Sequence, residues 1–308
     1  MNPADTADTG EYSAPPPMPD VQPPQAVSSK VRVDIAALSD PGKVRPHNED
    51  HYLVVRSERA LETLLTNLPP GRVPSRFAEV GYGMVVADGM GGAAAGEVAS
   101  QLAISTLVNL VLHTPDWIMR IGDAEAKEVM RRMTDRFQLV DAILREQAEI
   151  DPSLAGMGTT MTLAASVGYD LILAHIGDSR AYLLRDGELH QMTRDHTLVQ
   201  GLVDLRVIRP EQVATHRLKH VLTRVLGASA DQMEAEVQRV FPADEDQVLL
   251  CTDGLTDMVD SAAIAAGLRH AKSSEEACRA LVDKALENGG VDNITVVVAR
   301  YRFPSDLE

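Results

Sequence analysis

The sequence predicts an α+β protein in which antiparallel sheets lie in layers with helices packed on their outer faces. Strand-like runs occur in groups, and two long helical segments follow one another in the middle of the chain. A doubly wound parallel sheet would instead need strands and helices in regular alternation. No internal repeat of 20–50 residues is evident, which argues against a solenoid or a propeller.

The N-terminal segment 1–29 holds seven prolines and little that could pack, so we expect a disordered tail. Its polyproline runs could dock a partner, but we favour the interpretation as a linker. The composition then becomes typical of a globular protein, and we expect one folded domain over residues 30–304. The alternation in "KVRVDIAA" predicts its first strand. A turn-rich loop, "DPGKVRPHNED", separates this strand from "HYLVV" (51–55), which predicts the second.

The next part of the chain predicts an insertion, a strand and two helices. Residues 57–80 resemble a short helix followed by a Pro/Gly loop, and we interpret them as a surface insertion. "GYGMVVADG" (81–89) predicts a strand, and the apolar spacing within 94–113 predicts a helix. Residues 124–149 predict a second helix whose apolar stripe faces the core.

The C-terminal half predicts strands first and then a mixture. Two strands lie in 157–168 and 170–178, and Asp186-Gly187 predicts a type I′ turn of a hairpin. Short helices and loops fill 195–226. "DQVLLCTDG" (246–254) predicts a strand, 273–290 a capped helix that ends at glycine, and "NITVVVARYRF" a final strand.

The charge balance and the cysteine count exclude several classes of protein. The formal net charge is −16, which disfavours nucleic acid as a partner because phosphate backbones repel an acidic surface. No apolar run suggests a membrane span, and the N-terminus shows no secretory signal. Only two cysteines occur, which fits a reducing cytoplasm. We therefore expect a cytoplasmic protein with no membrane partner.

Aspartates recur at the ends of apolar strands or on the loop beside the next strand. They are Asp50, Asp88, Asp178, Asp253 and Asp292. A single Asp-Gly at a strand end is usually a turn, but several carboxylates brought together repel one another and favour a divalent cation. Oxygen ligands without a His/Cys cluster suit Mg²⁺ or Mn²⁺ and argue against structural zinc.

Phosphate chemistry is suggested by the loop in front of the first of these aspartates. Two metal ions a few ångströms apart can activate water and stabilise charge on a transferring phosphoryl group. Arg45 precedes Asp50 by five residues, and a guanidinium can donate two parallel hydrogen bonds to phosphate. Gly89 follows Asp88 and leaves its carbonyl free to reach a metal.

Six motifs in order resemble those of the metal-dependent Ser/Thr protein phosphatases of type 2C. They are "RPHNED", "VVADGMGG", "GMGTT", "HIGDSRAYLLRDGEL", "CTDGLTD" and "DNITVVV", and the resemblance runs from about residue 31 to residue 301. The residues in these motifs are those typical of the bacterial members of the family. The resemblance implies a central antiparallel β-sandwich flanked by helices, with a metal cluster at one end and a mobile flap at 195–226.

The resemblance also implies roles for individual residues. Asp88 would bridge two metal ions, and the Gly89 carbonyl would bind the first. Asp253 and Asp292 would hold the second, and Asp178 with Asp253 a third, weaker ion. Two residues, Glu49 and Asp50, would contact the cluster largely through water. Arg45 would bind the substrate phosphate, whereas "MGTT" and Ser179-Arg180 would support the sheet and loops.

The activity implied by the family is hydrolysis of phosphoserine and phosphothreonine on proteins. A hydroxide that bridges the metals would attack phosphorus directly, and the phosphorylated partners would be a Ser/Thr protein kinase and its substrates. We expect a monomer. Met90 stands where animal members carry a histidine, so the proton for the leaving group must come from a metal-bound water, His47 or His51.

Two other functions stay open at this point. A regulatory module of the same fold without catalysis would require missing metal ligands, and the core aspartates are all present. Another metal-dependent phosphohydrolase or a nuclease is disfavoured by the acidic surface and by the lack of an Asp-x-Asp motif after an early strand. The flap sequence "LVDLRVI", where a Glu-Gly-type turn is expected, puts the flap contacts in doubt but not the metal chemistry.

Overall fold

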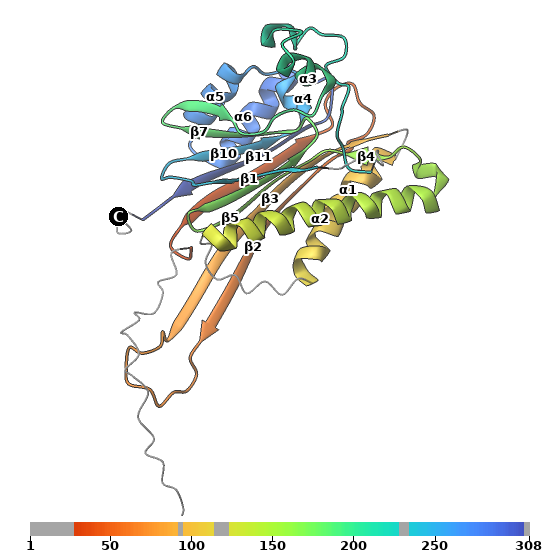
Figure 1. Ribbon diagram of the computed structural model, residues 1–308. Coiled ribbons are helices and arrows are strands. Elements are labelled where there is room, and N and C mark those ends of the chain that lie inside the picture. The colour runs from red at the N-terminus through yellow and green to blue at the C-terminus, as the bar shows by residue number, and fades with distance from the viewer. Residues whose placement is uncertain (1–27, 92–94, 114–122, 228–233, 305–308) are drawn as a thin grey trace, which may run out of the picture.

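Two antiparallel sheets lie face to face, and pairs of helices cover their outer surfaces (Figure 1). This computed structural model describes residues 28–91, 95–113, 123–227 and 234–304. The predicted proline-rich tail lies outside these residues except at its end. There Ser28 is already buried, and its hydroxyl accepts a hydrogen bond of 3.1 Å from the Val80 amide.

The first sheet has five strands in the order β1-β11-β10-β7-β8, each antiparallel to its neighbours. The strands are β1 (Arg32–Asp40), β11 (Ile294–Arg302), β10 (Gln247–Cys251), β7 (Arg180–Arg185) and β8 (Glu188–Gln191). The hairpin between β7 and β8 turns at Asp186 and Gly187, whose φ angles of 51° and 81° are those of the predicted type I′ turn.

The second sheet has the order β2-β3-β5-β6-β9, with the short β4 paired to β3. Its strands are β2 (Asp50–Glu62), β3 (Arg76–Met90), β4 (Gly158–Thr159), β5 (Met161–Val167), β6 (Asp170–Ile176) and β9 (Glu236–Val240). Strand β2 pairs with β3 from Asp50↔Asp88 to Glu62↔Arg76. The predicted helix within 57–80 is therefore wrong, because β2 continues to Glu62 and β3 begins at Arg76, so both ends of this segment are paired strands that form a β-ribbon.

Helices α1 (Ala95–His113) and α2 (Asp123–Ile150) cover the second sheet, and α5 (Ser261–His270) and α6 (Ser274–Glu287) cover the first. The remaining described helices are short: η1 (Pro152–Leu154), α3 (Leu198–Asp204), η2 (Pro210–Gln212) and α4 (Asp253–Thr256). Sequence patterns did not indicate β9, α4 or α5. The expected cap of α6 is confirmed, since Ser273 accepts a hydrogen bond from the Glu276 amide.

Strict alternation along the strands assigns each side chain to one of three core layers. In β3, Val85 and Ala87 pack against α1 and α2, whereas Met84 and Val86 face the other sheet. In β11, Val296 packs against the helices α5 and α6, whereas neighbouring side chains face the second sheet. The result is the expected α-β-β-α sandwich, in which every central strand is covered on both sides.

Helix α1 is long and apolar enough by composition to cross a membrane, alone among the described helices. However, its Ala99, Ala103 and Leu107 are buried against the second sheet and α2. This packing explains the apolar composition, because a helix between a sheet and a second helix needs an apolar stripe wider than usual.

The start of β11 and the short helix α4 approach so closely that only glycine fits between them. A Cβ on Gly254 would lie 1.9 Å from the Asn293 carbonyl oxygen. This contact brings the end of β10 beside the end of the loop that precedes β11, which sets the spacing between Asp253 and Asp292.

We expect Gly254→Ala to lower the free energy of unfolding by about 3 kcal/mol, because the added methyl overlaps backbone that cannot rotate away. Gly201→Ala in α3 is the matched control: nothing lies within 4 Å of the position that its methyl group would take, and alanine favours the helix. Urea unfolding of both variants measures the difference. Equal stabilities would show that the backbone near Asn293 yields easily.

Candidate functional site

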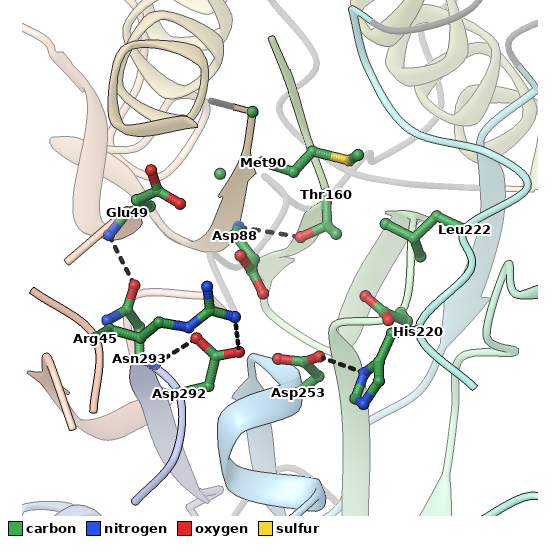
Figure 2. A pocket seen from close by; sticks show the side chains of 13 residues that line it. Arg45, Glu49, Asp88, Met90, Thr160, His220, Leu222, Asp253, Asp292 and Asn293 are labelled. Carbon is green, nitrogen blue, oxygen red and sulfur yellow. Dashed lines mark hydrogen bonds and ion pairs between the residues drawn. The ribbon is translucent and has the colours of Figure 1, made fainter. Parts of the chain in front are cut away.

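A cavity of ≈ 390 Å³ opens at the end of the sandwich where β2 begins and β3 ends, and it collects side chains from distant parts of the chain (Figure 2). The strand-end carboxylates and the Arg45 loop meet here. The lining residues are Arg45, Glu49, Asp88, Gly89, Met90, Gly91, Thr160, Asp178, His220, Leu222, Asp253, Asp292 and Asn293. Seven of the eight residues predicted for the site, all except Asp50, are among them.

The backbone of Asp88 is held by the threonines that follow Met157. The Asp88 amide donates to Thr160 Oγ1 (3.0 Å), and the Asp88 carbonyl accepts from the Thr160 amide (2.9 Å) and from Thr159 Oγ1 (2.8 Å). Thr160 Oγ1 also lies 2.7 Å from Ser179 Oγ, beside Asp178. These bonds give "MGTT" and Ser179 the supporting role expected from the sequence, because they join two carboxylate-bearing segments.

Glycine is required where β3 meets α1. A Cβ on Gly89 would lie 2.0 Å from the Gly96 carbonyl oxygen and 2.8 Å from that of Glu49. The Gly89 amide donates to the Glu49 carbonyl (3.2 Å), which also accepts from Ser100 Oγ (2.6 Å). Residues 49 and 89 are thus fixed side by side at the rim of the cavity.

Asp292 and Arg45 form an ion pair at the opposite wall. Arg45 Nη2 donates to Asp292 Oδ2 at 2.7 Å, and both side chains are partly exposed (Figure 2). The neighbouring Asn293 holds the loop that carries Arg45. Its Oδ1 accepts from the Glu49 amide, and its Nδ2 donates to the carbonyls of Pro41 and His47, each at 2.9 Å.

Asp50 occupies a different position from the other predicted residues. It does not line the cavity but is buried behind it, directly across the strand pair from Asp88. Its Oδ2 accepts from Thr252 Oγ1 at 2.7 Å, and its Oδ1 has no hydrogen-bond partner. A buried carboxylate oxygen without a donor is costly, which indicates a role for a bound water or cation here.

Burial and mutual repulsion make these carboxylates weak acids. Burial, with a contribution from Asp253, raises the pKa of Asp50 to about 7. Burial, then Asp50 and Asp253, raises the pKa of Asp88 well above its ordinary value. Burial, then Asp253 and Asp195, raises the pKa of Asp178 to about 8. The carboxyl groups of Asp50, Asp88 and Asp178 therefore hold their protons to higher pH than ordinary aspartates do.

The donor set fits divalent metal ions. Carboxylate oxygens and a backbone carbonyl converge without a cysteine, and bound cations would remove both the repulsion and the unpartnered state of Asp50 Oδ1. Hard oxygen donors of this kind are the ligands that Mg²⁺ and Mn²⁺ take in proteins.

Sequence reasoning assigned no role to Asp257 or His220, which extend the acidic cluster under the flap. His220 Nδ1 lies 3.6 Å from Asp253 Oδ2, its Nε2 lies 3.5 Å from Asp257 Oδ2, and Lys219 Nζ lies 3.0 Å from the same oxygen. A second cavity of ≈ 250 Å³ continues from here beneath the flap, with Asp178 at the junction. Asp257 follows Asp253 by four residues, a spacing that on a short helix places both on one face.

The histidines considered as proton donors lie elsewhere. Neither His47 nor His51 lines the cavity, and the His51 ring lies 2.8 Å from Ser100 Oγ and 3.2 Å from Gln101 Nε2. Of the described histidines, His220 is the one in the cavity wall. Its interaction with Asp253, and then with Asp257, raises its pKa, which increases its protonated fraction near neutral pH.

Fold and site together are those of the type 2C protein phosphatase family. The family model "Protein phosphatase 2C" matches residues 76–288, and the chain belongs to this family. The solved structure of the serine/threonine phosphatase PstP from Mycobacterium tuberculosis has a TM-score of 0.71 and 37% identity, covering 88% of this chain and 99% of that one. The catalytic domain of PstP was also solved with two manganese ions (TM-score 0.69, 36% identity).

Two relatives illustrate the extent of the similarity. PstP of M. tuberculosis is 39% identical over 264 residues, which is 86% of this chain and 44% of PstP. The serine/threonine phosphatase stp of Listeria monocytogenes is 34% identical over 260 residues, 84% of this chain and 92% of stp. The chain therefore spans less than half of PstP but nearly all of the Listeria phosphatase.

The raised pKa values predict a pH-dependent stability of the metal-free protein. Asp50 and Asp178 have folded-state pKa values of about 7 and about 8 against an ordinary value of 3.8, so the folded state binds more protons than the unfolded state between these limits. Stability is then highest near pH 4–5 and falls as pH rises toward 8. We expect Tm of the EDTA-treated protein to drop by roughly 5 °C or more over this range.

The control for this measurement is the same titration with Mn²⁺ present. At pH 8 the carboxyl groups have lost more of their protons than at pH 6, and a bound cation offsets the resulting negative charge. Mn²⁺ should therefore raise Tm more at pH 8 than at pH 6. A metal-free Tm that rises steadily with pH from 5 to 8 would contradict the assigned electrostatics.

Proposed function

We propose that this protein is a metal-dependent protein phosphatase that hydrolyses phosphoserine and phosphothreonine side chains of other proteins. The observation that carries the proposal is the convergence of Asp88, Asp178, Asp253 and Asp292 with Arg45 on one cavity. Acidic side chains supply the cation sites and the guanidinium supplies a phosphate contact. Membership of the type 2C family and the similarity to PstP and stp support this activity.

The metal ligands are proposed residue by residue. Asp88 and the Gly89 carbonyl would hold a first ion, with Asp88 shared with a second ion held by Asp253 and Asp292. Asp178 with Asp253 would hold a third, weaker ion. When bound, Mn²⁺ or Mg²⁺ supplies an activated water nucleophile and stabilises charge on the phosphoryl group. The two manganese ions in the PstP catalytic domain support manganese for two of these sites.

Glu49 and Asp50 would contact the metal cluster through water rather than as direct ligands. Glu49 lines the cavity wall, and burial raises its pKa. Asp50 Oδ1, which has no protein partner, is available to accept a hydrogen bond from a water in the cluster. Both carboxylates would therefore orient water through hydrogen bonds, which fixes the direction of attack on phosphorus.

Arg45 is the proposed phosphate-binding residue. One of its terminal nitrogens is bound to Asp292, and this pair orients the planar guanidinium at the edge of the cavity. A guanidinium has five N–H donors, so the pair leaves donors that phosphate oxygens can use. The side chain is half exposed, so a phosphorylated residue of another protein can reach it.

The leaving serine or threonine oxygen needs a proton, and Met90 cannot supply it. The Met90 side chain lies at the cavity rim (Figure 2), where it can contact substrate but carries no acidic proton. Water in the site or His220 would then protonate the leaving oxygen. His220 is favoured over His47 and His51 because it lies in the cavity wall.

The partners follow from this activity. We propose phosphorylated proteins, among them a Ser/Thr protein kinase and its substrates, with the flap at 195–226 contacting the protein around the phosphorylated residue. We further propose that the protein acts as a monomer in the cytoplasm. Both cysteines are buried and unpaired, which fits a reducing compartment.

The proposal is tested by Mn²⁺-dependent hydrolysis of p-nitrophenyl phosphate and of a phosphothreonine peptide. Asp88→Asn should lower kcat by about 1,000-fold, because it removes a charge that several metal contacts share. Met90→Ala should retain at least a third of the activity, roughly, since no proton comes from this position.

Asp260→Asn is the matched control for the first variant. Asp260 caps α5 through a 2.8 Å bond to the Ala263 amide, and asparagine caps a helix equally well. A wild-type protein that is inactive with Mn²⁺ would contradict the proposed enzyme and favour the non-catalytic regulatory module. A loss of activity in Met90→Ala as large as that in Asp88→Asn would contradict the inference that Met90 has no direct part in catalysis.

The hydrogen bonds of Asn293 predict a coupling between this residue and Arg45. Asn293→Ala releases the loop that carries Arg45, so we expect KM for the phosphopeptide to rise by roughly tenfold with a smaller change in kcat. Arg45→Ala should raise KM similarly. If Asn293 acts through Arg45, the double variant resembles Arg45→Ala alone.

The control is Asn288→Ala, which removes a single side-chain bond to the Met258 carbonyl at the C-terminal end of α6. Its KM should stay at the wild-type value. Effects of Arg45→Ala and Asn293→Ala that multiply fully in the double variant would show that Asn293 does not position the arginine.

A further inference from the structure

The flap at 195–226 carries positive charge on a protein that is strongly acidic as a whole. It holds five arginine and lysine side chains and three acidic side chains, whereas the formal net charge of the chain is −16. The flap also borders the site. Its residues Pro210, Val213 and Lys219 line the cavity of ≈ 250 Å³ beneath it, and His220 and Leu222 line the cavity that contains Asp88 and Arg45.

Ion pairs neutralise the acidic side chains of the flap more than its basic ones. Asp195 is bonded to an arginine of β7, and Asp204 is bonded to Arg194, which precedes the flap. Two of the three flap acids are therefore paired with arginines from outside the flap. The third, Glu211, is exposed.

Three exposed arginines of the flap have no acidic partner. Arg206, Arg209 and Arg217, which we call the flap arginines, form no ion pair within the described part of the chain. Arg209 is adjacent to Pro210, and Arg217 precedes Lys219 by two residues. Each of these two arginines therefore has its Cα within about 8 Å of the Cα of a residue that lines the lower cavity.

Arg206 has a backbone conformation that is unusual for a residue with a side chain. Its φ angle of 58° lies in the left-handed region, which glycine adopts without a steric penalty. It stands in "LVDLRVI", where the sequence led us to expect a turn with glycine. Its neighbours Leu205 and Val207 are 76% and 65% exposed, so this turn presents both charge and apolar surface to solvent. A contact with another molecule would explain an arginine at this position.

We propose that the flap arginines select phosphoproteins in which aspartate or glutamate residues flank the phosphorylated residue. The inference rests on the proposed phosphatase activity and adds the class of sequence on which it acts. When the phosphate is bound at Arg45, the neighbouring residues of the substrate lie at the rim of the cavity, and the flap forms part of this rim. A guanidinium without a partner binds a carboxylate through two parallel hydrogen bonds.

The charge of the whole protein would favour the opposite kind of substrate. At long range a chain with a net charge of −16 attracts basic segments and repels acidic ones. A preference for acidic flanking residues can therefore come only from local contacts, within about one Debye length (~8 Å) of positively charged side chains. The sign of the preference thus separates recognition by the flap from the general field of the protein.

The test is Mn²⁺-dependent hydrolysis of two phosphothreonine peptides, one with glutamates and one with lysines on both sides of the phosphothreonine. We expect kcat/KM of the wild type to be roughly tenfold higher for the glutamate peptide, mainly through a lower KM, because three exposed Arg–carboxylate pairs can supply such a factor. High salt should reduce the preference. Hydrolysis of p-nitrophenyl phosphate, which has no flanking residues, is the reference for each protein.

The variant that removes the flap arginines combines Arg206→Gly, Arg209→Gln and Arg217→Gln. Its ratio of kcat/KM for the glutamate peptide to that for the lysine peptide should fall to about one or below, because only the field of the acidic body is left. Glycine suits the left-handed backbone at position 206, so Tm should not fall.

The matched control removes three positive charges far from the flap, by Arg32→Gln, Arg279→Gln and Arg302→Gln. Arg32 pairs with Arg302 at the end of β1 and β11 away from Asp292, and Arg279 is exposed on α6. This control should keep the wild-type ratio. A wild type that does not prefer the glutamate peptide, or a flap variant that keeps the preference, would overturn the inference alone. A wild type that hydrolyses neither the peptides nor p-nitrophenyl phosphate would overturn the proposed phosphatase activity, and the inference with it.

Discussion

The repulsion among carboxylates at one end of the sandwich is the constraint on which the rest of the structure depends. Asp50, Asp88 and Asp178 are buried and have raised pKa values, and Asp253 contributes to each shift. A fold stabilised by apolar layers alone would place such groups in water. Their burial together is explained by divalent cations, and the two sheets hold the ligands in place without cations by packing on three apolar layers.

Close backbone contacts fix the relative positions of the segments that carry these carboxylates. Gly89 and Gly254 are positions where a methyl group would overlap a carbonyl oxygen, so the ligand-bearing segments approach more closely than side chains would allow. Asn293 adds three hydrogen bonds that hold the Arg45 loop beside Asp292. Arg45, the proposed phosphate-binding residue, is therefore hydrogen-bonded into the same part of the structure as the proposed metal ligands, whereas His220 and Lys219 reach the site from the flap.

Much of the site could be predicted because its residues are tied to local patterns. A carboxylate at the end of an apolar strand and a glycine after it can be recognised from a few residues, and their order along the chain resembles one family. Asp257 was missed because α4 is a single turn after a strand and leaves no periodic signal. The ribbon was mistaken for a helix because leucines and glutamates favour helices, while pairing with β3 decided otherwise.

By itself the sequence determined the α+β class, most helices and strands, and most of the residues that meet at the candidate site. These follow from periodicity and residue type, which act over a few positions. Only the tertiary structure decided that Asp50 lies behind the cavity, that Arg45 pairs with Asp292, and that β2 and β3 continue as a paired ribbon to Glu62 and Arg76. Such facts depend on contacts between segments up to 247 residues apart, and no local preference encodes them.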